Sequence, residues 1–222
     1  MDFMKIMKER HSVRSYKDKV IAGDVKKELL SLIGQCNKES GLHMQLVTDE
    51  PQAFDGFMAH YGKFSGVRNY IAMVGPKGAG LEEMCGYHGE RVVLKAQELG
   101  LNTCWVALTY SKIKNAFKVE PGEKLCCVIA IGYGSTQGVS HKVKAIESLC
   151  KTEGNMPQWF RNGMVAAQLA PTAMNQQKFL FTLKGNKVSA KAGRGFYTKL
   201  DLGIAKYHFE AGAGTSGWEW ER

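Results

Sequence analysis

The sequence predicts one α+β chain in which helices flank a mixed sheet, and three observations support this prediction. Apolar residues make up 44% and charged residues 23% of the chain, which is ordinary composition for a globular protein. Apolar strand segments and helical periodicities both occur, without the regular strand–helix alternation of a doubly wound sheet. A β-hairpin, formed by residues 179–183 and 187–191 around Gly185 and Asn186, lies between two predicted helices.

The elements predicted for the first part of the chain each carry a start signal or an apolar pattern. Helices are expected over residues 2–9, 24–36, 81–99 and 111–117. The expected N-caps are Asp2, Asp24 and Ser111. Strands are expected over residues 42–47, 70–74, 103–107 and 124–131. Gly86 and Gly89 lie inside the long helix, where each costs about 1 kcal/mol relative to alanine, so they indicate close packing against another helix.

The last third of the chain is predicted to form a helix–hairpin–helix unit. Pro157 fits the first turn of a helix over residues 157–169. Asp201 is the expected N-cap of a final helix over residues 201–210. The tail, residues 212–222, is rich in glycine and tryptophan and is expected to be irregular.

A weak internal repeat is visible in this order of elements. The helix–loop–strand–helix order of residues 24–99 recurs over residues 157–210, although chance similarity stays open as the alternative. We therefore expect a core domain over residues 1–150 and a second half-copy over residues 151–222.

The basic charge of the chain limits the partners that it could have. The formal net charge is +9, but the positive residues are scattered and no nucleic-acid-binding motif occurs, so no nucleic-acid partner is expected. A solvated lysine-rich surface and a surface that attracts a small anionic ligand both stay open. Because no apolar run could span a membrane and the first residues do not resemble a secretory signal, we expect a cytoplasmic protein.

Cysteine and histidine spacing argues against a metal site. None of the six cysteines forms a Cys-x-x-Cys pair, and the six histidines form no His-x-x-x-His pair. The cysteines are expected to be small core side chains in a reducing cytosol, and no metal ligand is expected.

The string Arg10-His11-Ser12-Val13-Arg14 places two guanidinium groups and a hydroxyl around one loop. Arginine offers paired donors that fit phosphate oxygens, and charged hydrogen bonds are the strong ones. Backbone N–H groups of the loop can add to such a grip. Taken alone, the string is also compatible with an ordinary surface loop.

Two further segments could lie beside a planar ligand. Residues 170–177, Ala-Pro-Thr-Ala-Met-Asn-Gln-Gln, join a helix end to a strand with small residues, amides and a hydroxyl, so they could lie flat against an aromatic ring. An amide-rich connector is the alternative. Residues 99–107, Leu-Gly-Leu-Asn-Thr-Cys-Trp-Val-Ala, indicate a helix end followed by a buried strand.

Together these three segments resemble the FMN-dependent nitroreductase superfamily. Residues 10–14 are similar to that family's Arg-x-Ser-x-Arg opening, which holds the FMN phosphate, and residues 99–107 are similar to its strand beside the flavin. Residues 131–134, followed by 141–144, are similar to a strand end and a basic segment that also reaches the phosphate. The resemblance spans Met1 to about Cys150 and implies a nitroreductase-like fold with a central mixed antiparallel sheet flanked by helices.

One departure from the family pattern points to a subgroup. The pattern Ala-Pro-Ser-x-x-Asn-x-Gln is absent from residues 35–45, where the family has it, and a similar string stands at residues 170–177. This arrangement is similar to a small subgroup of nitroreductases that resemble a Thermotoga protein and contain a duplicated half in one chain. The resemblance implies a single-chain pseudo-dimer, so a monomer is favoured and a homodimer stays possible.

The resemblance also assigns the candidate cofactor contacts. The FMN phosphate and ribityl chain would be held by Arg10, His11, Ser12 and Arg14, with added charge from Lys142 or Lys144. The flavin ring would lie along Trp105, Val106 and Ala107, and against Pro171, Thr172, Ala173, Asn175 and Gln177. No catalytic side chain and no metal ligand is expected, because the chemistry belongs to the flavin.

The implied function is that of an FMN-dependent NAD(P)H oxidoreductase. Hydride would pass in a ping-pong sequence through flavin N5 to a small organic acceptor such as a nitroaromatic or a quinone. A glutamate that family members often have at the strand end is replaced here by Ala107. A non-catalytic flavin-binding protein, serving as a store or a sensor, is therefore the alternative function.

Overall fold

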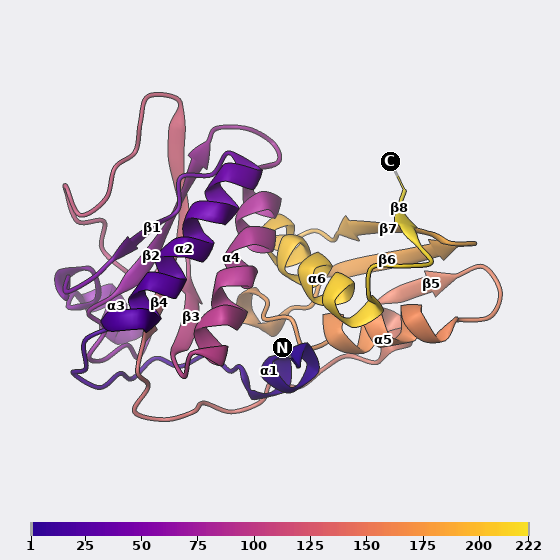
Figure 1. Cartoon of the computed structure of the whole chain (residues 1–222), viewed down its shortest axis with the longest axis horizontal. Coiled ribbons are helices and arrows are strands. Elements are labelled where there is room, and N and C mark those ends of the chain that lie inside the picture. The colour runs from indigo at the N-terminus through magenta and orange to yellow at the C-terminus, as the bar shows by residue number, and fades with distance from the viewer. Residues whose placement is uncertain (1, 222) are drawn as a thin grey trace. The chain divides into compact units, whose positions relative to one another are not determined.

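The computed structural model describes residues 2–221, which form an α+β protein as the sequence predicts. The elements fall into two compact units, each with its own four-stranded sheet (Figure 1). We call residues 9–81 and 92–139 the first-sheet unit, and residues 2–8, 82–91 and 140–221 the second-sheet unit. No helix within residues 2–221 combines the length and the apolar character needed to cross a membrane.

The first sheet is antiparallel throughout, with the strand order β1-β2-β4-β3. Its strands are β1 (Gln45–Val47), β2 (Tyr70–Pro76), β3 (Asn102–Val106) and β4 (Glu123–Gly132). The three longer strands confirm the predicted segments. The first strand is shorter than predicted, because the Met44 backbone N–H and C=O both bond to the side chain of Asn37.

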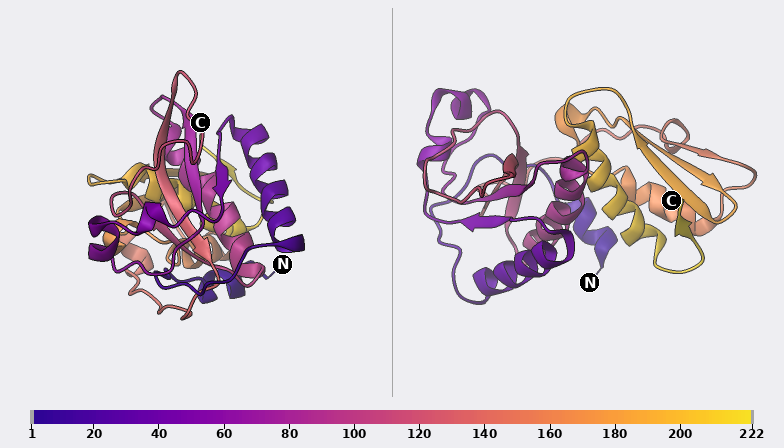
Figure 2. Two further views of the ribbon diagram at one scale, coloured as in Figure 1. Left: turned by 90° about the vertical axis from the view of Figure 1, so that its left-hand side faces the viewer. Right: turned by 90° about the horizontal axis from the view of Figure 1, so that it is seen from above.

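Helix α2 (Gly23–Ser40) lies against one face of the first sheet and buries Leu29, Ile33 and Cys36 (Figures 1 and 2). The prediction that Asp24 caps this helix was wrong: Ala22 is the N-cap residue, it has no side-chain cap bond, and Asp24 lies in the first turn. The helix also continues past Gly34 and ends at Gly41, whose φ of 72° suits glycine.

The prediction of a helix over residues 111–117 is wrong, because these residues bond to and pack against distant parts of the chain. The Ser111 N–H bonds to the Ala53 carbonyl, and Asn115 adopts a φ of 67°, which a helix does not allow. Phe117 packs edge-on against Tyr70 in the core instead. The short helices α3 (Phe57–Tyr61) and η1 (Gln52–Phe54) and the last turns of α4 (Leu81–Glu98) complete this unit.

The second sheet has the strand order β5-β6-β7-β8 and combines antiparallel and parallel pairing. The antiparallel hairpin of β6 (Phe179–Lys184) and β7 (Lys187–Ala192) confirms the predicted one. Two short strands pair parallel on either side, β5 (Cys150–Thr152) and β8 (Glu219–Trp220). Neither was predicted, and the tail expected to be irregular therefore contains a strand.

Helices α5 (Gln158–Ala167) and α6 (Thr198–Ala213) lie side by side on one face of the second sheet (Figure 2). They approach closely at Gly163, where an added Cβ would lie 2.6 Å from the Phe209 ring. The prediction that Asp201 caps the last helix was wrong, because α6 begins at Thr198 and Asp201 lies inside its first turn with 1% of its surface exposed. The unit also contains α1 (Phe3–Glu9), η2 (Ile146–Ser148) and η3 (Ala173–Asn175).

The first turns of α4 cross α6 at two glycines that face each other's backbone. A Cβ added to Gly86 would lie 2.1 Å from the Leu200 carbonyl oxygen, and one added to Gly203 would lie 2.0 Å from the Glu83 carbonyl oxygen. Each glycine thus meets the carbonyl three residues before the other, so the crossing is reciprocal. The prediction of close packing at Gly86 is borne out by these distances.

A fully buried histidine–glutamate pair joins the same helices. His208 Nε2 lies 2.9 Å from Glu90 Oε1, and both side chains are 0% exposed. His208 Nδ1 lies 3.1 Å from the Ala166 carbonyl oxygen, and because a carbonyl only accepts, Nδ1 is the donor. Residues of α4, α5 and α6 are therefore tied together through one imidazole.

Gly203→Ala should destabilise the protein, because the added carbon would press on the Glu83 carbonyl. We expect the free energy of unfolding to fall by about 1–3 kcal/mol, the usual cost of overpacking. Gly34→Ala is the matched control in a helix interior: no described atom lies within 4 Å of its added carbon, so stability should rise by up to about 1 kcal/mol. Urea unfolding followed by circular dichroism measures both, and equal effects would contradict the close crossing.

Candidate functional site

The Arg10–Arg14 segment runs beside β3 in the first-sheet unit. The Val13 N–H donates to the Thr103 carbonyl at 3.0 Å, and Ser12 forms a parallel bridge with Thr103. The structure therefore places the predicted phosphate-binding string next to the predicted ring-lining strand. Ser12 and Thr103 lie about ninety positions apart in the sequence, and they meet here through backbone pairing.

The side chains around this contact create a positive environment. Arg10 is buried with 3% exposure, Arg14 is exposed, and the Ser12 hydroxyl lies within hydrogen-bond reach of the Cys104 thiol. Burial raises the pKa of the Cys104 thiol, and the charge of Arg14, the Ser12 hydrogen bond and the charge of Arg10 act in the opposite direction. The net rise favours the protonated thiol, and the buried Cys104 side chain packs in the core of this unit.

Two further contacts hold the string in shape. The Tyr16 hydroxyl donates to the Val13 carbonyl at 2.7 Å. Gly138 adopts a φ of 70°, and a Cβ added to it would lie 2.8 Å from the His11 Cβ. The chain that follows β4 therefore passes directly over His11 and leaves room only for a glycine.

The side chains at the end of β3 differ in their exposure to solvent. Val106 is buried, Trp105 and Ala107 are half-buried, and Leu108 is 69% exposed. A planar ligand lying along these residues would meet apolar surface, because Trp105, Val106 and Ala107 are all apolar.

In the second-sheet unit, loop 170–177 is bound to segment 141–144 by a glutamine clamp. The Gln177 side chain accepts from the Lys144 N–H at 2.9 Å and donates to the Lys142 carbonyl at 2.8 Å. Its own backbone N–H donates to the Thr172 hydroxyl at 3.0 Å. Gln177 is 3% exposed, so these groups replace water for one another.

The two candidate lysines differ in what their ammonium groups do. Lys144 Nζ donates to the carbonyls of Gln176 at 2.8 Å and Gln177 at 3.2 Å, so it orders the loop. Lys142 is exposed, and its backbone carbonyl also accepts from Asn175 Nδ2 at 2.9 Å. Lys142 is thus the lysine whose charge is better placed to meet a ligand.

Sequence reasoning missed Asp201 as part of this loop. Its buried carboxylate accepts from the Ala173 N–H at 2.9 Å and from Gln176 Nε2 at 2.8 Å. In the sequence, this aspartate indicates only a helix cap, which is the common role of aspartate near a helix start. The position of this aspartate between two leucines, Leu200 and Leu202, is the signal that could have revealed it.

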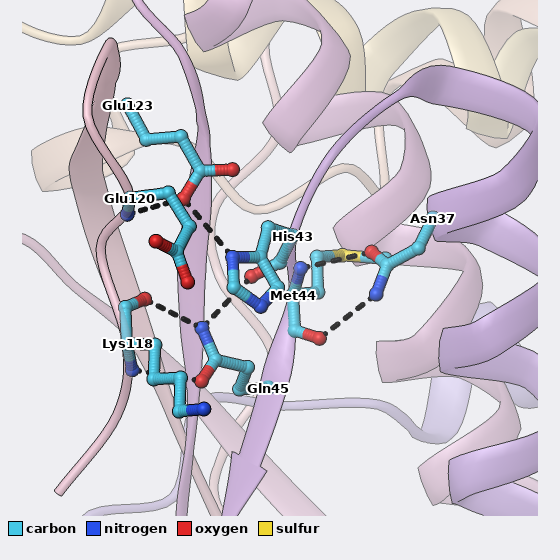
Figure 3. Close-up of polar contacts among 7 residues, drawn as sticks. All are labelled: Asn37, His43, Met44, Gln45, Lys118, Glu120 and Glu123. Carbon is cyan, nitrogen blue, oxygen red and sulfur yellow. Dashed lines mark hydrogen bonds and ion pairs between the residues drawn. The ribbon is translucent and has the colours of Figure 1, made fainter.

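The segment at which the family pattern is absent, residues 35–45, forms a clamp of the same kind (Figure 3). Gln45 accepts from the Lys118 N–H at 2.9 Å and donates to the Lys118 carbonyl at 2.8 Å. Ser40 precedes Gln45 by five residues, as Thr172 precedes Gln177. The two loops therefore share a spacing and a backbone-binding glutamine, although the rest of the pattern differs.

His43 lies two residues before Gln45, as Asn175 lies two residues before Gln177. His43 pairs with Glu123 (Figure 3). His43 Nδ1 lies 3.0 Å from Glu123 Oε2, and this bond is the largest influence that lowers the pKa of Glu123. The Glu120 N–H also donates to Glu123, at 2.8 Å. Within residues 2–221 no group of three His, Cys, Asp or Glu side chains is arranged to hold a metal ion.

The structure therefore places the predicted site residues as two sets, one in each unit. The first set holds Arg10, His11, Ser12, Arg14, Trp105, Val106 and Ala107. The second set holds Lys142, Lys144, Pro171, Thr172, Ala173, Asn175 and Gln177. Within each set, backbone and side-chain bonds join the segments that the sequence predicted separately.

Comparison with known proteins gives the chain a family context. Residues 2–213 match the family described as "Putative TM nitroreductase". A putative nitroreductase of Thermotoga maritima has a similar structure, with a TM-score of 0.65, 21% identity, and coverage of 95% of this chain and 83% of that chain. No curated protein matches the chain by sequence.

Two less similar structures cover a smaller part of this chain. A putative NADH dehydrogenase/NAD(P)H nitroreductase of Bacteroides thetaiotaomicron has a TM-score of 0.52 and 19% identity, over 67% of this chain and 96% of that one. A nitroreductase family protein of Streptococcus pneumoniae has a TM-score of 0.53 and 13% identity, over 66% of this chain and 98% of that one. These likenesses show that the fold is nitroreductase-like.

Gln177→Ala should loosen segment 141–144, because the Lys144 N–H and the Lys142 carbonyl lose a buried partner. We expect a loss of about 1–3 kcal/mol in the free energy of unfolding and faster hydrogen exchange at the Lys144 amide. Gln35→Ala removes an exposed amide that bonds to Glu39 and should change stability by less than about 0.5 kcal/mol. Unchanged exchange at Lys144 in Gln177→Ala would show that the clamp does not hold the segment.

Proposed function

Because the chain belongs to the putative TM nitroreductase family, we propose that this nitroreductase-like oxidoreductase uses FMN and NAD(P)H. Its acceptor would be a small organic molecule such as a nitroaromatic or a quinone. The observation that carries the proposal is the pairing of the Arg10–Arg14 segment with β3, because it places cations and a hydroxyl beside a half-buried apolar surface. FMN combines a phosphate with a planar ring, and it needs both kinds of surface.

The donor set of the first-sheet unit fits the phosphate end of FMN. Arg10 and Arg14 carry permanent charge, and guanidinium groups pair well with phosphate oxygens. Ser12 can turn its hydroxyl toward such an oxygen, and His11 adds a ring nitrogen. We assign the phosphate to these residues.

The loop residues of the second set, 171–177, fit a planar ring. Pro171, Thr172 and Ala173 are half-buried and small, and they lie in an extended stretch and one short turn before β6. Gln177 uses its amide on the backbone of segment 141–144, so we assign it the role of holding Thr172 and Asn175 in place. Asn175 is exposed; its side-chain oxygen accepts from Gln177 Nε2 at 2.8 Å and keeps one lone pair for a further donor.

Bound FMN would supply hydride-transfer chemistry between NAD(P)H and the acceptor. The protein's part is to bind and orient the reactants, and no side chain is assigned as a general acid or base. We propose one FMN per chain, which is the stoichiometry expected of a single-chain pseudo-dimer. We therefore favour a monomer as the active form.

A flavin-binding store or sensor is the second candidate function. The specific observation that favours it is Ala107, which cannot make the contacts of the glutamate that the family often has at this strand end. Such a protein would bind FMN through the same residues without turning over NAD(P)H.

Anaerobic reduction separates the two functions. We expect purified protein to bind one FMN per chain, and NADH or NADPH to bleach the flavin absorption within the time of an ordinary assay. A quinone added afterwards should restore the absorption, which completes the ping-pong sequence. Flavin that stays oxidised with both nucleotides would support the storage function, and protein that binds no flavin would reject both.

Arg14→Ala should weaken FMN binding because it removes a charged contact to the phosphate. We expect a loss of about 1.5–3 kcal/mol, which is roughly 10- to 150-fold in Kd. Riboflavin lacks the phosphate, so its Kd should be the same for the variant and the original protein. Arg68→Ala, which removes an equally charged guanidinium that pairs with Asp49, is the control and should leave FMN affinity within about twofold. Equal losses in both variants would indicate general charge attraction and not a phosphate site.

A further inference from the structure

Two loops leave the same end of the β6–β7 hairpin, and polar contacts join them. The loops are residues 172–177, which precede β6, and residues 193–197, which follow β7. The Gly193 N–H donates to the Lys178 carbonyl at 2.7 Å, and Gln176 Nε2 donates to the Phe196 carbonyl at 2.8 Å. A Cβ added to Gly195 would lie 2.7 Å from Gln176 Oε1, so the loops touch.

The buried carboxylate of Asp201 accepts hydrogen bonds from the first of these loops, residues 172–177. Asp201, with 1% exposure, binds the Ala173 N–H through Oδ1 and Gln176 Nε2 through Oδ2. Burying a carboxylate is costly unless hydrogen bonds replace its water, and here both oxygens have donors. Among residues 2–221 no charged side chain makes a hydrogen bond or an ion pair with this carboxylate, and the groups that face it are an amide N–H and a carboxamide.

The loops also contain unfavourable backbone conformations. Met174, Asn175, Gln177 and Tyr197 have φ values of 50°, 53°, 44° and 57°. Non-glycine residues adopt this left-handed region at a cost of roughly 1–2 kcal/mol each. Strain of this kind persists where surrounding contacts enforce it, and it gathers at ligand-binding sites.

Each loop presents one large apolar side chain to solvent. Met174 is 85% exposed and Phe196 is 77% exposed. Exposed lysine and arginine side chains flank them, namely Lys178, Arg194 and Lys199. A Cβ added to Gly195 would lie 3.3 Å from Lys178 Nζ, so one of these ammonium groups lies directly against the second loop.

We propose that Met174 and Phe196 form the contact surface for a planar aromatic, negatively charged electron acceptor, and that Asp201 is the positioning residue that holds their two loops together. An aromatic ring and a thioether bind a flat ring by stacking and by sulfur–ring contact. The three cations favour an anionic substituent on that ring. The proposal rests on the proposed function, since it names the acceptor class for that reaction.

Steady-state kinetics of the FMN-loaded enzyme tests the contact residues. Phe196→Ala should raise KM for 4-nitrobenzoate about tenfold, the equivalent of one aromatic contact, with kcat nearly unchanged. Phe196→Tyr keeps an aromatic ring, so its KM should equal that of the original protein. Ferricyanide is an anionic acceptor without an aromatic ring, and its KM should be the same for all variants. Phe57→Ala removes an equally exposed phenyl ring from α3 and is the matched control. An unchanged KM in Phe196→Ala, or an equal rise in Phe57→Ala, would overturn the proposal.

The pH profile tests the positioning residue. Burial raises the pKa of Asp201 to about 6, against the opposite effect of the bonds from Ala173 and Gln176. Below that pH one carboxyl oxygen carries a proton and no longer accepts from Gln176, so KM for 4-nitrobenzoate should rise as the pH falls through 6. Asp201→Asn keeps the acceptor for Ala173 but offers Gln176 a donor, so its KM should be high at every pH. A variant that follows the original pH profile would remove Asp201 from this role.

Methyl NMR tests the surface without any flavin reaction. Addition of 2-naphthoate should shift the Met174 methyl signal, and Phe196→Ala should weaken this binding several-fold. Met58, an exposed methionine on α3, is the internal control. A Met174 signal that does not move, or that moves no more than that of Met58, would overturn the proposal. A shift at Met174 in a protein that NAD(P)H does not reduce would instead keep the aromatic site and reject the proposed oxidoreductase.

Discussion

The reciprocal glycine crossing of α4 and α6 is the contact on which the second-sheet unit depends. Because Gly86 and Gly203 each face a carbonyl of the other helix, the close contact fixes the position of α6 along the axis of α4. The first turn of α6 carries Asp201, so the crossing also fixes where that carboxylate lies. Loop 172–177 takes its shape from the carboxylate, and a packing constraint between two helices thus becomes the geometry of a surface loop.

Side-chain amides supply hydrogen-bond partners for backbone groups in several loops. Backbone N–H and C=O groups outside helices and strands still need partners, and a carboxamide offers a donor and an acceptor on one rigid plane. Gln45 uses both on Lys118, Asn37 uses both on Met44, and Gln177 uses both on segment 141–144. The recurrence of this clamp at Gln45 and Gln177 is in keeping with the internal repeat, which stays a prediction.

The sequence predicted elements whose signal is local and missed those that depend on distant partners. The long strands, the hairpin and the helix through Gly86 were predicted because apolar patterns of such length have few alternatives. Strands β5 and β8 have too few residues for any periodicity and exist only through parallel pairing. Asp24 and Asp201 look like helix caps in the sequence, yet neither caps a helix, and Asp201 is used by a loop about 28 positions earlier.

For the candidate site, the string Arg10–Arg14 and the loop 170–177 were recognisable by resemblance, whereas the atoms that each side chain would use were not. Gln177 illustrates the difference, because only the folded chain shows its amide committed to backbone groups.

The tryptophans are divided unequally between the two units, and this division has an optical consequence. Trp159 and Trp218 stack with centroids 5.9 Å apart at 7°, and Trp220 meets Trp218 edge-on at 5.2 Å, all in the second-sheet unit. Trp105 on β3 belongs to the first-sheet unit. Closely packed indoles couple and give an exciton signal in circular dichroism. That signal would report on the C-terminal aromatic cluster, so its loss on heating would follow the melting of the second-sheet unit.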